Sequence, residues 1–131
     1  MRVGVKREDL IYSDEAYKIM GAVFDVYKEL GFGYREGVYQ KAIAKRLKEK
    51  GIKFEEQIYC PVKFHNEAVG KNFFDFLIDN KIILEIKVRN YFSKKDIEQL
   101  LSYLKVSGLK LGIIIHITRD GAKFKRIVNI I

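Results

Sequence analysis

Two neighbouring segments of alternating residues constrain the fold more than any other part of the sequence. In residues 73–78 and again in residues 81–88, large apolar side chains occupy every second position. A repeat of two is typical of β-strands, and the intervening Asp79 and Asn80 are typical turn residues. The segments therefore predict a β-hairpin with one wholly apolar face that belongs to the core. That face would carry Phe74, Phe76, Ile78, Ile82, Leu84, Ile86 and Val88.

The opposite face of this hairpin carries charges, which need a reason in strands that are otherwise so apolar. If Ile78 pairs with Ile82, Asp75 lies directly across from Glu85, with β-carbons about 5 Å apart. Two carboxylates at that distance repel, and burial would raise their pKa values unless a positive charge compensates. An oxygen-preferring divalent cation would provide that charge, and Lys87 on the same face adds a second one. The structural alternative is a partly solvated pair of Glu85 and Lys87, with Asp75 only marking the strand near a turn.

The rest of the chain supplies further strands and three helices around the hairpin. Ser13 or Asp14 can cap the first helix and Ser93 the third, with Asp96 three residues on. From the second helix onward the order is helix, three strands, helix, strand, which predicts an α/β fold with one sheet and helices packed on it. The expected helices cover residues 13–30, 34–50 and 93–106, and the expected strands cover residues 52–60, 62–64, 73–78, 81–88, 111–117 and 124–130.

Three of these elements carry more specific expectations. In the second helix the apolar spacing predicts that Val38, Ala42 and Leu47 face inward. Pro61 is expected to interrupt the first strand, because proline cannot donate a hydrogen bond to a neighbouring strand. Residues 111–117 are a continuous apolar run, which is typical of a strand buried on both faces.

Length and composition limit the kind of protein that carries this sheet. A chain of 131 residues fits one domain, which we place at residues 13–131 after an N-terminal arm of residues 1–12. No apolar run approaches the length needed to cross a bilayer, and the start, MRVGVKREDL, lacks the apolar core of a signal peptide. We therefore expect a cytoplasmic protein without a membrane partner. Cys60 is the only cysteine, and His65 and His116 are too far apart in sequence to indicate a zinc site.

The net charge of +8 is large for a chain of this size. A strongly basic protein attracts polyanions, of which nucleic acid is the commonest. Lysine-rich surfaces also occur where only solubility is needed. The charge is thus consistent with a nucleic-acid partner without establishing one.

Two motifs give the sequence a resemblance to a known family. The segment Gly33-Tyr34-Arg35-Glu36-Gly37-Val38-Tyr39 fits the pattern after which the GxxExxY family is named. Asp75, followed by Glu85-Ile86-Lys87, resembles the D…ExK signature of the PD-(D/E)XK nuclease superfamily, with which that family is grouped; Phe74 replaces the proline. The likeness continues through LKEKGIKFEEQ and QLLSYLKVSGLKLGIIIHI to the closing strand. It implies a restriction-endonuclease-like core with a central mixed sheet flanked by helices.

The resemblance also implies an activity: hydrolysis of phosphodiester bonds in DNA, with Mg²⁺ or alternatively Mn²⁺. Asp75, Glu85 and Glu36 would hold the metal, and Lys87 would position or deprotonate water and stabilise developing charge. Glu36 also has a structural explanation, because a carboxylate early in a helix meets the positive end of the dipole. A non-catalytic nucleic-acid-binding protein and an oligomeric accessory protein remain alternatives, and formation of a homodimer stays open.

Basic and polar residues after the ExK strand extend the candidate site. Arg89, Lys94 and Lys95 would lie close to it and contact phosphates. Gln99 falls where many members of the superfamily place a supporting polar residue. The structural alternatives are a solvated lysine pair and a hydrogen-bonded helix flank.

Overall fold

The computed structural model describes residues 11–130, so most of the predicted N-terminal arm lies outside the described residues. The chain order confirms the predicted helix, three strands, helix and strand from the second helix onward, and the predicted closing strand follows. The helices are α1 (Ser13–Leu30), α2 (Glu36–Glu49) and α3 (Lys94–Ser107). The strands are β1 (Phe54–Phe64), β2 (Glu67–Ile78), β3 (Ile82–Lys87), β4 (Leu111–Thr118) and β5 (Gly121–Val128).

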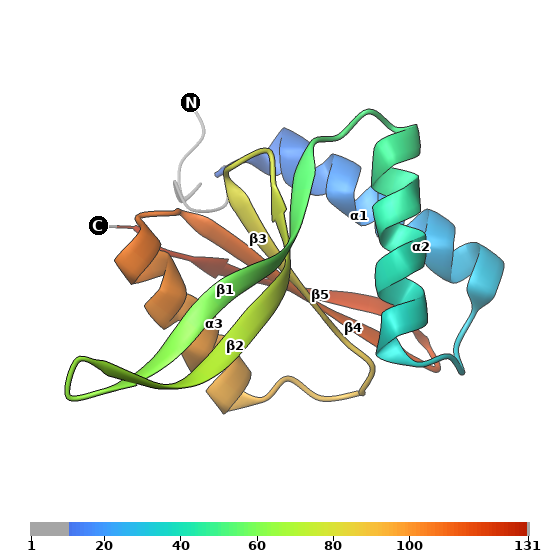
Figure 1. Cartoon of the computed structure of the whole chain (residues 1–131). Helices are drawn as coiled ribbons and strands as arrows, with labels where there is room; N and C mark the ends of the chain where they lie inside the picture. The colour runs from blue at the N-terminus through green and yellow to red at the C-terminus, as the bar shows by residue number, and fades with distance from the viewer. Residues whose placement is uncertain (1–10, 131) are drawn as a thin grey trace, which may run out of the picture.

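The strands form one mixed sheet in the order β1-β2-β3-β4-β5 (Figure 1). β3 and β4 run parallel and are connected through α3, whereas all other neighbours are antiparallel. The core has two parts: α1 and α2 pack on one face of the sheet, and α3 packs on the other. This confirms the α/β class with a central mixed sheet flanked by helices. None of the described helices is both long and apolar enough to cross a membrane.

Close contact between α3 and the sheet depends on a glycine in β4. A Cβ atom added to Gly112 would lie 2.7 Å from Cδ2 of Leu100, which is itself buried in α3. The missing side chain therefore lets Leu100 reach the sheet surface. All eight residues of β4 are buried, as predicted for a strand covered on both faces.

The β2–β3 hairpin has the predicted register, because Ile78 pairs with Ile82. The prediction that Phe74 shares a face with Phe76 is wrong: Phe76 packs on the α1 and α2 side, whereas Phe74 packs on the α3 side. The change of face falls where the pairing of β1 with β2 is interrupted. Between the pairs Glu56↔Phe76 and Ile58↔Phe74, Gln57 and Asp75 do not pair, and Gln57 has a positive φ of 56°.

Proline does not end the first strand as expected. β1 continues through Pro61, which pairs in register with Lys71 of β2. This is possible because β1 lies at the edge of the sheet, where a missing N–H can face solvent.

The helix starts and faces were predicted in part. The cap position of α1 is Tyr12, with no side-chain hydrogen bond, so the predicted capping by Ser13 or Asp14 is wrong. Ser93 does cap α3, accepting the N–H of Asp96 at 3.4 Å. Val38 is 40% exposed rather than inward. The buried residues of α2 are Tyr39, Ile43 and Leu47.

Candidate active site

The candidate site lies where β2 and β3 separate. The paired residues end at Phe76 and Leu84, and the next two residues, Asp75 and Glu85, bond through their side chains instead. The N–H of Asp75 donates to Oε1 of Glu85 at 3.0 Å, and the N–H of Ile86 donates to Oδ2 of Asp75 at 2.8 Å. Each carboxylate thus takes the place of a main-chain acceptor on the neighbouring strand. The diverging backbone fixes both groups beside each other.

Burial and mutual repulsion dominate the electrostatics of these two carboxylates. Asp75 is 9% exposed, and burial raises its pKa, opposed by the hydrogen bond from Ile86. Burial and the nearby charge of Asp75 raise the pKa of Glu85 to about 8. Lys87 opposes this rise, since its Nζ lies 3.4 Å from Oε2 of Glu85. One lysine therefore compensates two neighbouring acids, the buried Asp75 and the partly buried Glu85. A bound cation would supply the positive charge that is still missing.

Glu36 approaches this group from another element. It is the first residue of α2, where a carboxylate interacts favourably with the helix dipole. Partial burial raises the pKa of its carboxyl group, the charge of Lys87 lowers it, and the charge of Asp75 raises it. The start of α2 therefore lies within electrostatic range of the strand carboxylates.

The two strand carboxylates could hold an oxygen-preferring divalent cation between them. Among residues 11–130 no three or more histidine, cysteine, aspartate or glutamate side chains gather closely enough to enclose a metal. Mg²⁺ usually takes only one or two carboxylates and completes its shell with water and substrate phosphate. Asp75 and Glu85 meet that requirement. Glu36 does not join them in a three-ligand cluster, so its role as a ligand stays a prediction.

The predicted phosphate-binding residues divide into two groups. Arg89 is held in place by Asp96 of α3, with 2.5 Å between Nη2 and Oδ2, and its Nη1 donates to the hydroxyl of Tyr91 at 3.3 Å. Lys94 and Lys95 are exposed at the start of α3, and Gln99 is half-buried. Within the described part of the chain, no hydrogen bond or ion pair links these three to the carboxylates. Their contacts with nucleic acid remain predictions.

One buried residue beside the site was not predicted from the sequence. His116 of β4 pairs in register with Lys87 and is 1% exposed. Neither ring nitrogen has a hydrogen-bond partner among the described residues, and Phe92 packs edge-on against the ring, with centroids 3.8 Å apart. Burial, together with the charge of Arg89, lowers its pKa to about 4, so the imidazole is neutral at pH 7. In the sequence, His116 is the one titratable residue in the apolar run 111–117. That exception could have indicated a residue of the site.

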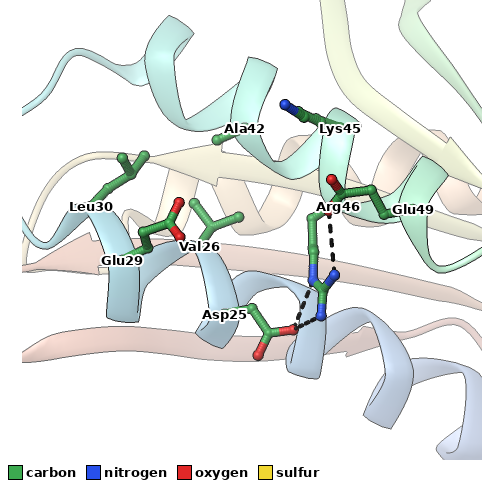
Figure 2. A pocket seen from close by; sticks show the side chains of 8 residues that line it. All are labelled: Asp25, Val26, Glu29, Leu30, Ala42, Lys45, Arg46 and Glu49. Carbon is green, nitrogen blue, oxygen red and sulfur yellow. Dashed lines mark hydrogen bonds and ion pairs between the residues drawn. The ribbon is translucent and has the colours of Figure 1, made fainter.

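Of the cavities among the described residues, two differ in how their lining residues relate to the candidate site. A cavity of about 420 Å³ between α1 and α2 is crossed by the ion pair of Arg46 with Asp25, 2.9 Å apart, and is not lined by any of the candidate site residues (Figure 2). The second, of about 330 Å³, gathers residues from the loop after α1, the segment after β3 and the β4–β5 turn. It is lined by Phe32, Arg89, Asn90, Thr118, Arg119 and Asp120. The smaller cavity thus shares Arg89 with the candidate site.

The fold and the candidate site agree with the family that the sequence matches. Residues 13–127 match the model of the PD-(D/E)XK nuclease superfamily, and the chain belongs to that superfamily. None of the curated proteins compared with the chain matches it.

Two solved structures share the fold at low sequence identity. The crystal structure of SSO0001 has a TM-score of 0.53 and 19% identity; the match covers 93% of this chain and 61% of SSO0001. The alkaline exonuclease LHK-Exo from Laribacter hongkongensis has a TM-score of 0.51 and 13% identity, over 90% of this chain and 71% of the exonuclease. Both likenesses support a restriction-endonuclease-like core.

Proposed function

We propose that this protein is a Mg²⁺-dependent nuclease of the GxxExxY family that hydrolyses phosphodiester bonds in DNA. The observation that carries the proposal is the pair of carboxylates of Asp75, which is buried, and Glu85, which is partly buried. They are fixed side by side, with Lys87 against Glu85. Both acids have raised pKa values. Such perturbed groups, in a fold that belongs to a nuclease superfamily, are typical of a catalytic centre.

Each residue has a distinct role in the proposed reaction. A bound magnesium ion would supply a water of lowered pKa and neutralise charge on the scissile phosphate. Asp75 and Glu85 would hold that ion, and Lys87 would stabilise the charge that develops on the phosphate or accept a proton from the water. Glu36 would orient a water or complete a second metal position. Mn²⁺ is expected to substitute for Mg²⁺.

Positive charge around the site favours nucleic acid as the partner. The chain carries a net charge of +8. Arg89 and Arg119 line the cavity at the carboxyl ends of β3 and β4, and Lys94 and Lys95 are exposed at the start of α3. Arginine and lysine side chains in such positions would contact the phosphates on either side of the cleaved bond. We place the whole activity in a single domain of residues 13–131 and expect it in the cytoplasm.

The experiment that tests the proposal uses a panel of labelled DNA and RNA substrates, single-stranded, duplex and branched, incubated with Mg²⁺, Mn²⁺ or EDTA. We expect DNA to be cut in either metal and to stay intact in EDTA. Glu98→Gln, which changes an exposed glutamate on α3, provides a control and should cut like the wild type. Binding to DNA without cutting in any metal would instead support the non-catalytic alternative.

A further inference from the structure

The paired strands β1 and β2 extend far beyond the part of the sheet that supports them. β2 pairs with β3 only through Phe76, Leu77 and Ile78, whereas its pairing with β1 continues to the pair of Phe64 with Glu67. Figure 1 shows this two-stranded hairpin projecting away from the remaining strands. We call residues 58–74 the β1–β2 arm. Isolated two-stranded ribbons are only marginally stable, so the arm needs support from elsewhere.

That support comes on one face of the arm only. Ile58, Cys60 and Phe74 belong to the part of the core under α3, and the ring of Phe74 lies 5.1 Å from that of Tyr103. Side chains alternate between the faces of a strand, so the neighbours of these residues lie on the opposite face. That opposite face carries Tyr59 and Phe73, which pair across the two strands.

Tyr59 and Phe73 form an exposed aromatic pair. Their ring centroids are 5.7 Å apart with an angle of 51° between the planes, and the two residues are 48% and 46% exposed. Lys71 lies two residues before Phe73 in β2, on the same face of the arm, and its side chain is exposed. Exposed aromatic rings beside a lysine are typical of sites that bind unpaired nucleotides, because each nucleotide offers a flat base for stacking and a phosphate for the cation.

The position of this pair links it to the candidate active site. Phe73 lies two residues before Asp75 in β2, which is about 7 Å along a strand. An unpaired stretch of a few nucleotides that continues from the cleaved phosphate along the arm would reach the rings. In a duplex the bases already stack on each other, so only an unpaired base gains from this contact.

We propose that Tyr59 and Phe73, with Lys71 beside them, form a stacking platform for unpaired bases, so that the substrate is single-stranded DNA or a single-stranded end. This inference rests on the proposed function for the adjoining catalytic centre. It assigns the uncovered face of the β1–β2 arm to the substrate rather than to a second copy of the chain.

The test measures binding without cleavage. Fluorescence anisotropy in EDTA would give the affinity of a labelled 20-nucleotide dT strand and of a 20-base-pair duplex for the full chain. The double variant Tyr59→Ala with Phe73→Ala should weaken binding of the single strand by about tenfold or more, whereas duplex binding should change by less than about twofold. Tyr59→Phe, which keeps a ring, should retain the affinity. Tyr17→Ala provides a matched control, because Tyr17 is a 79% exposed tyrosine on α1.

Several results would overturn the inference. Single-strand affinity that is unchanged in the double variant, or lost equally for strand and duplex, would do so. Light scattering that shows a wild-type dimer and a monomeric double variant, with unchanged single-strand affinity, would assign the face to a second copy. Because no metal is present, the result is independent of cleavage: metal-dependent cutting with unaltered binding would contradict the platform and leave the nuclease proposal standing.

Discussion

Replacing Asp75 with asparagine is expected to reduce Mg²⁺-dependent cleavage by about a thousandfold, since metal coordination and charge stabilisation at the phosphate both depend on that carboxylate. The amide oxygen that Asp75→Asn introduces can still accept the N–H of Ile86, so the strands should keep their arrangement.

Lys87→Ala should lower the cleavage rate by about 10²- to 10⁴-fold, the range for loss of a group that transfers protons or stabilises charge. Initial rates on the substrate identified by the panel would measure both effects.

Asp79→Asn provides the control for this series. Asp79 is an exposed carboxylate in the turn between β2 and β3, only four residues from Asp75. Its variant should cleave at the wild-type rate. If Asp75→Asn, properly folded by circular dichroism, cuts DNA as fast as the wild type, the assignment of the catalytic centre is wrong.

Glu85→Gln is expected to stabilise the metal-free protein while it removes activity. Glutamate ordinarily titrates near 4.5, but in the folded protein burial and Asp75 raise the pKa of Glu85 to about 8. Below pH 4.5 the side chain is neutral in both states. As the pH rises from 4.5 to 8, the unfolded chain loses the proton and the folded chain keeps it, so stability falls by an amount on the order of a few kcal/mol. The neutral amide of glutamine escapes this loss.

Urea unfolding in EDTA at about pH 5 and about pH 8 would measure the effect. The free energy of unfolding of Glu85→Gln should exceed that of the wild type by a few kcal/mol at the higher pH, and the difference should shrink at the lower pH. His116 titrates in both proteins, so its contribution largely cancels in the comparison. A glutamine variant that is less stable than the wild type at the higher pH would contradict the electrostatic account of the site.

The features that the sequence predicts well depend on local patterns. Alternation in residues 73–78 and 81–88 was enough for the hairpin and for the register of Ile78 with Ile82. The apolar run in residues 111–117 was enough for the buried strand β4. Because that register is right, Asp75 and Glu85 come together as predicted, and their raised pKa values follow from burial.

The features that the sequence did not predict depend on contacts between distant segments. Phe74 changes face where the pairing of β2 with β1 is interrupted, next to Gln57 with its positive φ. Arg89 is held by Asp96, which requires α3 to fold back over the end of β3. His116 lies beside Lys87 only through the parallel pairing of β3 with β4. None of these contacts leaves a periodic signal in one sequence.

Mn²⁺ binding to the substrate-free protein is the most direct measurement of whether the two strand carboxylates form a metal centre. In calorimetric titrations at about pH 8, the wild type should bind Mn²⁺. Asp75→Asn and Glu85→Gln should each weaken Mn²⁺ binding by more than about 100-fold. Loss of a residue that only supports a metal ligand costs about 10- to 100-fold in affinity. Asp79→Asn should bind like the wild type. Mn²⁺ binding of equal strength in all four proteins would place the metal elsewhere and contradict the proposed centre.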